Sequence, residues 1–401
     1  MPPIDALRKA FDQDKVTLTE HLENDLRQSN GPKIRDQDVC IVFGNADAGE
    51  GFIHWDGNAG DRNDLYLQNG GEDLVKDVAD NCGGGHGSTI VVIHSVGPVL
   101  VDAWIDHPRV KAVVMANLPG EESGNALASI LFGDVNPSGK MPYTMAKSVG
   151  DYGPAGKILF LPNAFVPQQD FSEGLYVDYR HFDKYEIEPR FEFGFGLSYT
   201  TFDYSDIKIT EKKGKSALPA KRPDATATPP EYDNKMPSVE EALFPKEIRR
   251  LEKYVYPYID SADEIKHGDY QYPDGYDIEQ PLSPAGGGEG GNPDLWEVHV
   301  KVSVQVKNSG SVGGKVVPQL YLSYPEKSEA SATVDFPVRV LRGFDKVYLE
   351  KSESKTIEFE VTRRDLSYWD VVRQNWVMLV EGEYKFAVGE SSRDLRLEAT
   401  W

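Results

Sequence analysis

The sequence is poor in cysteine, in basic charge and in long apolar runs. Two cysteines in 401 residues are too few for a disulfide scaffold, and we interpret Cys40 and Cys82 as buried free thiols. Lys and Arg total 43 against 65 Asp and Glu, a formal charge of −22. Such a surface repels phosphate and argues against nucleic acid as a partner. No apolar run approaches the roughly 18 residues of a transmembrane helix, so no membrane partner is expected.

Several chemical signatures are also missing. The N-terminus is charged from Asp5 onward and does not have the pattern of a signal peptide. The eight histidines form no H-x-x-x-H or H-E-x-x-H pair, so we expect no metal site. Gly44 and Gly49 lack the spacing of a dinucleotide-binding loop, and Ser123 misses the register of a nucleophile elbow. We therefore expect no cofactor.

The first part of the chain alternates short apolar runs with amphipathic segments. The runs predict three buried strands, at Val39–Phe43, Thr89–Ile93 and Lys111–Met115. The segments between and after them predict helices at Glu72–Asn81, Pro98–Ile105 and Glu121–Phe132. This alternation predicts an α/β domain over residues 34–150, with a mostly parallel sheet covered on both faces. Residues 1–33 are interpreted as an N-terminal remnant.

The end of the chain has a different period. Five valines alternate with polar residues between Val298 and Val306, and seven short strand-like runs follow one another within residues 297–401. This pattern predicts an immunoglobulin-like or fibronectin-III-like β-sandwich. Residues 151–210 are interpreted as a connecting segment that docks the two domains. Residues 211–296, with the tract Ala285–Gly291, are interpreted as a Pro/Gly-rich insertion or linker.

One loop stands out as a candidate site. The first predicted strand runs into a glycine-rich loop in which Gly49 and Gly51 flank Glu50. Ligands of α/β sheets bind at the carboxyl ends of strands, and a lone carboxylate held out on such a loop suits a general acid. The like charge of Asp47 and partial desolvation would raise the pKa of Glu50 toward the neutral range that an acid needs.

Two aromatic residues, Phe52 and Trp55, follow Glu50 and can stack on a sugar ring. The simpler alternative is that Glu50 is an ordinary solvated loop residue, and spacing alone does not choose between the two.

Several longer motifs resemble the fungal-type β-glucosidases of glycoside hydrolase family 3. The loop Gly49–Phe52 followed by Asp56–Asn63 resembles their acid/base loop. The resemblance continues in the same order along most of the chain, outside residues 211–285. Its further segments are Val91–Pro98, Leu118–Leu127, Gly133–Gly139, Glu173–Asp183, Arg190–Phe202, Val317–Leu322, Leu341–Phe344, Thr362–Asp370 and Val388–Arg393.

The resemblance implies a specific site and architecture. Such enzymes have a (β/α)8 barrel, then an α/β sandwich, then a fibronectin-III-like domain, and they hydrolyse cellobiose, short β-glucans and aryl glucosides with retention. The barrel carries an aspartate nucleophile and the sandwich a glutamate acid/base, which Glu50 matches. Phe52 matches an aromatic residue, commonly Tyr, that stacks on the leaving-group sugar. Members are usually secreted, which implies an extracellular location.

The chain departs from this family in two respects. A barrel takes about 250 residues, whereas 38 residues precede Val39, and no segment resembles the nucleophile motif. The α/β sandwich is expected to be incomplete as well, because its first strand–helix units are missing. We therefore expect the C-terminal half of such an enzyme, inactive alone, with a barrel domain as an intramolecular or intermolecular partner. The alternative is a non-catalytic glycan-binding or scaffold protein.

Overall fold

The protein was analysed as a computed structural model, which describes residues 2–11, 14–24, 26, 33–49, 61–157, 164–221, 235–236, 238–239, 292–326 and 334–401. The chain divides into two compact units. One comprises Met1–Ala217, Val298–Ser367 and Met378–Trp401, and the other Leu218–Glu297 and Tyr368–Val377. The predicted order of an α/β region followed by a β-sandwich is confirmed. No helix within the described ranges is long and apolar enough to cross a membrane.

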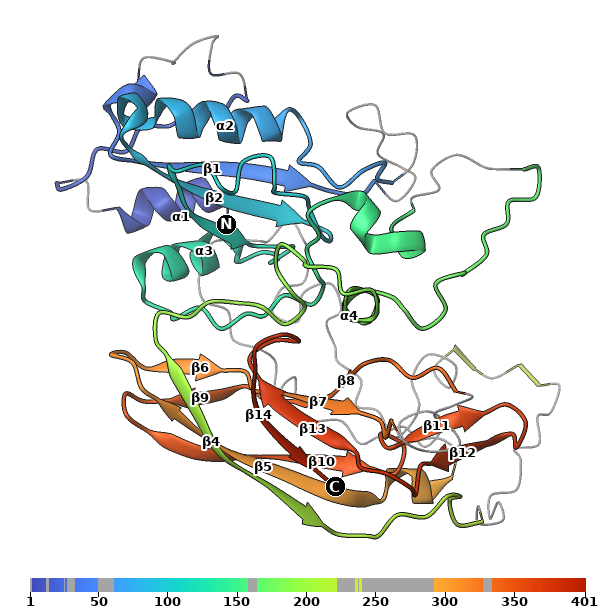
Figure 1. Ribbon diagram of the computed structural model, residues 1–401. Helices are drawn as coiled ribbons and strands as arrows, with labels where there is room; N and C mark the ends of the chain where they lie inside the picture. The colour runs from blue at the N-terminus through green and yellow to red at the C-terminus, as the bar shows by residue number, and fades with distance from the viewer. Residues whose placement is uncertain are drawn as a thin grey trace. The chain divides into compact units, whose positions relative to one another are not determined.

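The α/β region is built on a three-stranded parallel sheet. Its strands are β1 (Val39–Ala46), β2 (Ser88–Ser95) and β3 (Val110–Met115), in the order β1-β2-β3. The central strand places Val91, Val92 and Ile93 fully out of solvent. This complete burial explains why β2 reads as a continuous apolar run. Because the three strands are parallel, their carboxyl ends lie at one edge of the sheet, as Figure 1 shows for β1 and β2.

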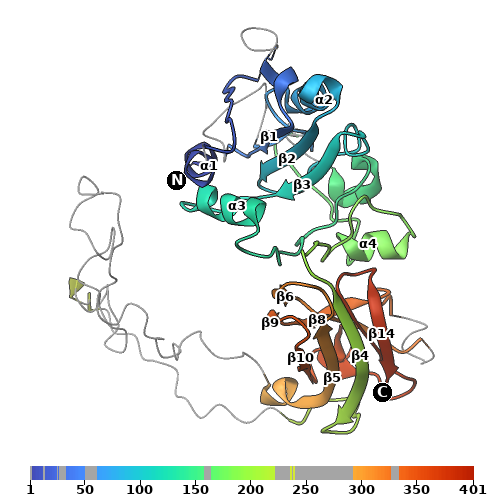
Figure 2. The ribbon, with the colours of Figure 1, turned by 90° about the vertical axis from the view of Figure 1, so that its left-hand side faces the viewer.

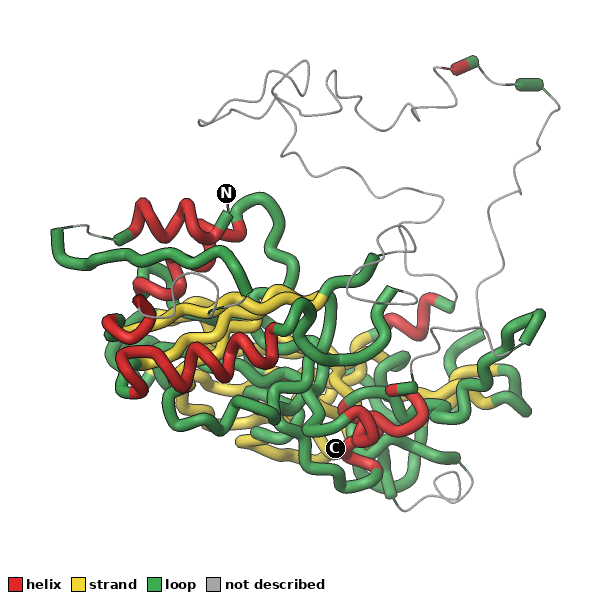
Figure 3. Tube along the Cα trace, turned by 90° about the horizontal axis from the view of Figure 1, so that it is seen from above, coloured by secondary structure: helices red, strands yellow, loops and turns green. Residues whose placement is uncertain are grey.

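Helices lie on both faces of this sheet (Figures 2 and 3). Helix α2 (Gly71–Asn81) lies on one face, while α1 (Pro3–Ala10) and α3 (Ser123–Phe132) pack together on the other. Gly133 ends α3 with a left-handed φ of 80°, as the sequence predicts. Short 3-10 helices occupy Lys33–Asp36, Cys82–Gly85, Val149–Gly156 and Pro293–Trp296.

The predicted helix at Pro98–Ile105 is wrong, because this stretch forms turns instead. The N–H groups of Trp104 and Ile105 both donate to Val101 O, which closes a single turn. The N–H of Leu100 donates outside the segment, to Leu65 O at 2.7 Å. The segment therefore forms a backbone hydrogen bond to a distant part of the chain instead of the continuous hydrogen bonds of a helix.

The prediction of two free thiols is also wrong. Cys40 in β1 and Cys82 after α2 form a disulfide across 42 residues, with Cα atoms 6.2 Å apart. The parallel pairing of β1 with β2 brings the start of β1 beside the chain that leaves α2. That spacing falls within the range that a disulfide bridges without backbone movement.

The C-terminal part is a sandwich of two antiparallel sheets. Strands β10-β5-β4 form one sheet and β14-β13-β7-β8 the other, and β6 pairs with β9. The predicted alternation in β5 (Val298–Asn308) is confirmed, because Val300, Val302, Val304 and Val306 are fully buried. The other bounds are β4 (Phe202–Glu211), β6 (Gly314–Val316), β7 (Gln319–Ser323), β8 (Val340–Phe344), β9 (Val347–Leu349), β10 (Ser354–Thr362), β13 (Lys385–Gly389) and β14 (Leu395–Thr400).

All but the last residue of strand β4 lie inside residues 151–210, the stretch interpreted as a connecting segment. It pairs with β5 over Phe202–Glu211, so the sandwich takes its edge strand from before the insertion. Ahead of β4, helix α4 (Tyr179–Lys184) and the residues after it bond to the sandwich. The Leu341 N–H donates to the Tyr179 hydroxyl at 3.0 Å, and Gln319 Nε2 donates to Gly194 O at 3.1 Å.

The part of the second unit between Tyr368 and Val377 forms most of a two-stranded hairpin. Its strands are β11 (Ser367–Asp370) and β12 (Asn375–Met378). Trp369 and Trp376 meet edge to face across the hairpin, with ring centroids 5.9 Å apart. This is the arrangement that aromatic pairs prefer.

Candidate active site

The candidate site lies at the carboxyl edge of the parallel sheet. Glu50 and Phe52, the site residues predicted from the sequence, fall within residues 50–60 and lie outside the described residues, as does Trp55. The structure describes the two segments on either side of them. We call residues 45–49 the outgoing stem and residues 61–68 the returning stem.

The outgoing stem continues β1 and is held on both sides. On one side, the Val96 N–H donates to Ala46 O at 3.1 Å, which extends the pairing with β2. On the other side, the Gln68 carboxamide forms two hydrogen bonds with the backbone of Asp47. The Asp47 N–H donates to Gln68 Oε1 at 3.2 Å, and Gln68 Nε2 donates to Asp47 O at 3.1 Å. Asp47 is therefore fixed three residues before Glu50.

The returning stem is anchored to the residues that follow β2. The Arg62 guanidinium donates to Pro98 O at 3.0 Å, and Leu65 O accepts from the Leu100 N–H. Burial lowers the pKa of Arg62, and the Asp64 carboxylate opposes this. Arginine remains charged in proteins, so a cation stands at the base of the loop.

Two further side chains complete the edge where β2 and β3 end. The Tyr143 hydroxyl donates to Asn117 Oδ1 at 2.9 Å, and burial raises the pKa of Tyr143, which keeps the phenol neutral. His94 in β2 lies against Phe43, and burial lowers the pKa of its imidazole. Both groups are therefore uncharged at neutral pH.

Across the residues that the structure describes, no three His, Cys, Asp or Glu side chains gather as a metal would require. The edge holds both ends of a loop that carries carboxylates.

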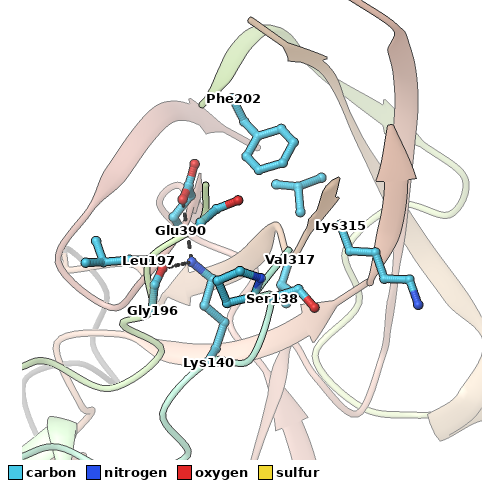
Figure 4. Close-up of a pocket in the computed structure, with 11 residues that line it drawn as sticks. Ser138, Lys140, Gly196, Leu197, Phe202, Lys315, Val317 and Glu390 are labelled. Atoms are coloured by element: carbon cyan, nitrogen blue, oxygen red, sulfur yellow. Dashed lines mark hydrogen bonds and ion pairs between the residues drawn. The ribbon is translucent and has the colours of Figure 1, made fainter. Parts of the chain in front are cut away.

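A small cavity lies elsewhere, beside the chain that leads into β4 (Figure 4). Its volume is about 10 Å³, far below the roughly 300 Å³ at which ordinary ligand pockets begin. Lys140 Nζ donates to Gly196 O at 2.8 Å and lies 3.5 Å from Glu390 Oε2. Burial lowers the pKa of Lys140, and Glu390 opposes this. The cavity has room for about one water molecule, and its Lys140 and Glu390 side chains pair with each other. It is therefore a packing feature rather than a substrate site.

Comparison with known proteins identifies the class to which this frame belongs. Residues 1–199 match the model of the glycosyl hydrolase family 3 C-terminal domain, and residues 316–392 match that of the fibronectin type III-like domain. The chain belongs to glycoside hydrolase family 3. The family resemblance seen in the sequence motifs is thereby confirmed.

Individual relatives agree with this assignment. The chain is 50% identical over 400 residues to probable β-glucosidase E of Aspergillus clavatus, covering 100% of this chain and 37% of that protein. It is also similar to the crystal structure of a β-D-glucoside glucohydrolase from Trichoderma reesei, at 35% identity and a TM-score of 0.74, covering 100% and 45%. A family 3 β-glucosidase from Neurospora crassa matches at 38% identity and a TM-score of 0.76, covering 100% and 48%. The chain spans less than half the length of each.

Proposed function

We propose that these 401 residues form the acid/base-bearing part of a retaining β-glucosidase. The observation that carries the proposal is the full-length match of this chain to probable β-glucosidase E of Aspergillus clavatus, at 50% identity. The site geometry supports it, because hydrogen bonds hold both stems of the loop that carries Glu50 at the sheet edge. Glycosidase acids need this fixed position beside the scissile bond.

The chemistry uses two carboxyl groups about 5–5.5 Å apart. The protonated Glu50 carboxyl gives its proton to the glycosidic oxygen as the bond from that oxygen to the anomeric carbon breaks. An aspartate carboxylate, supplied by a barrel domain outside these 401 residues, forms the covalent glycosyl ester. The Glu50 carboxylate then takes a proton from water as the water oxygen bonds to the anomeric carbon and the ester bond to the aspartate breaks. This step releases the sugar and regenerates both groups. Phe52 stacks on the leaving-group sugar.

We further propose an extracellular location. The disulfide between Cys40 and Cys82 supports it, because disulfides persist in oxidising compartments.

The test uses the chain extended at its N-terminus by the corresponding part of the Aspergillus clavatus relative. Glu50→Ala should slow hydrolysis of cellobiose by about 10²–10⁴-fold, the usual contribution of a general acid. The glycosylation of a dinitrophenyl glucoside should change little, because its leaving group needs no proton. Equal losses on both substrates would contradict the acid role. The 401-residue chain alone should turn over neither substrate, and robust turnover that Glu50→Gln abolishes would refute the need for a barrel.

A further inference from the structure

We propose that Gln68 is a positioning residue for the acid/base step. It acts by clamping Asp47, from which the catalytic loop departs. The proposal rests on the proposed function of Glu50 and adds a residue that no sequence motif singled out.

The clamp is formed by a buried side chain acting on an exposed residue. Gln68 is 8% exposed, whereas Asp47 is exposed. The buried carboxamide needs hydrogen-bond partners, and it finds both in the peptide groups of Asp47. The same two bonds fix where Asp47 lies.

The backbone of Gln68 reinforces the same contact. Its N–H donates to Asn45 O at 2.9 Å, and its carbonyl accepts from the Gly71 N–H at the start of α2 at 3.0 Å. Gln68 thus runs along β1 like an additional strand partner and is itself fixed by the helix. The carboxamide continues this pairing by one residue, to Asp47.

The clamp matters for function because Asp47 and Glu50 are close along the chain. Three residues separate Asp47 from Glu50, and a chain of three residues reaches at most about 11 Å. A shift of Asp47 is therefore passed on to the carboxyl group with few intervening bonds. A misplacement of about 1 Å at a reacting centre can cost as much as 10²-fold in rate.

The experiment compares kcat/KM for cellobiose with kcat/KM for a dinitrophenyl glucoside in the extended enzyme. The ratio of the two does not depend on the fraction of enzyme that is folded, so a merely structural role leaves it unchanged. Gln68→Leu removes both hydrogen bonds and should lower the ratio at least 10-fold. Gln68→Glu keeps the acceptor for the Asp47 N–H but loses the donor, and should lower the ratio by less.

Gln319→Leu is the matched control. Gln319 is also a buried glutamine whose amide donates to backbone carbonyls, Gly194 O and Glu390 O, but it lies at the β-sandwich. This variant should leave the ratio unchanged. A ratio within twofold of the parent in both Gln68 variants, with a large fall in Glu50→Ala, would overturn the positioning role alone. An unchanged ratio in Glu50→Ala would overturn the proposed function as well.

Discussion

The Asp183 carboxylate in α4 lies 3.3 Å from Nε of Arg339, which precedes β8, and 3.5 Å from Arg393. Its side chain is 5% exposed, and burial raises its pKa even though both guanidinium groups lower it. The interaction therefore ties α4 to the β-sandwich while the carboxylate remains a poorly solvated charge.

Removing one of the two arginines should leave the buried Asp183 carboxylate poorly compensated. Arg339→Met is expected to destabilise the protein, because the carboxylate loses one of its two cations. Asp183→Asn in the same background should restore part of the loss, because the buried charge is gone. A double-mutant cycle by chemical unfolding should give a coupling of about 0.5–3 kcal/mol. Additive effects of the two substitutions would contradict the coupling.

The Cys40–Cys82 disulfide closes a 42-residue loop. The chain-entropy model assigns about 4 kcal/mol to a loop of that size. The double substitution Cys40→Ala with Cys82→Ala should lower the unfolding free energy by about that amount. Reductant should lower the thermal transition of the parent protein and leave that of the variant unchanged. Two titratable thiols in the untreated folded protein would refute the pairing.

Glu72, in the first turn of α2, should make stability depend on pH. Its carboxylate accepts from the Leu67 N–H in the returning stem at 3.3 Å, and burial raises its pKa. Between the unfolded and the raised folded pKa, the folded state binds more protons, so stability falls as pH rises through that window. Glu72→Gln keeps the acceptor and removes the charge. Its melting temperature should match that of the parent at pH 4 and exceed it at pH 7, by a few degrees at most.

Asp73→Asn is the control for this effect. Asp73 is an exposed carboxylate in the same helical turn, where negative charge is favourable to the helix dipole. This variant should gain no stability on the parent between pH 4 and pH 7. A gain equal to that of Glu72→Gln would assign the effect to net charge rather than to burial.

Phe52 gives a prediction about the leaving group. If its ring stacks on the second sugar, Phe52→Ala in the extended enzyme should raise KM for cellobiose about 2- to 10-fold, corresponding to the ~0.5–1.5 kcal/mol of an aromatic contact. Methyl β-glucoside has no second ring and should be affected less. Equal changes for both substrates, measured by glucose release, would contradict a stacking role.

The candidate site was accessible from the sequence only in part. Glu50 and Phe52 follow from motifs that resemble a family, and they remain predictions because they lie outside the described residues. Gln68 gave no local signal, since its partner Asp47 lies 21 residues away. A glutamine contact of this kind becomes visible only when the two stems of the loop are placed side by side.

Local periodicity by itself determined most of the secondary structure. The apolar run in β2 and the alternation of valines in β5 are consequences of which face each side chain presents to a core. The stop at Gly133 follows from the left-handed backbone that glycine allows. Tertiary structure alone decided the turns at Pro98–Ile105, the Cys40–Cys82 bond and the place of β4 beside β5. Each of these depends on a partner distant in sequence. Hydrogen bonds and disulfides form between segments that lie close together in the folded chain. The sequence of one segment does not show which distant segment will lie beside it.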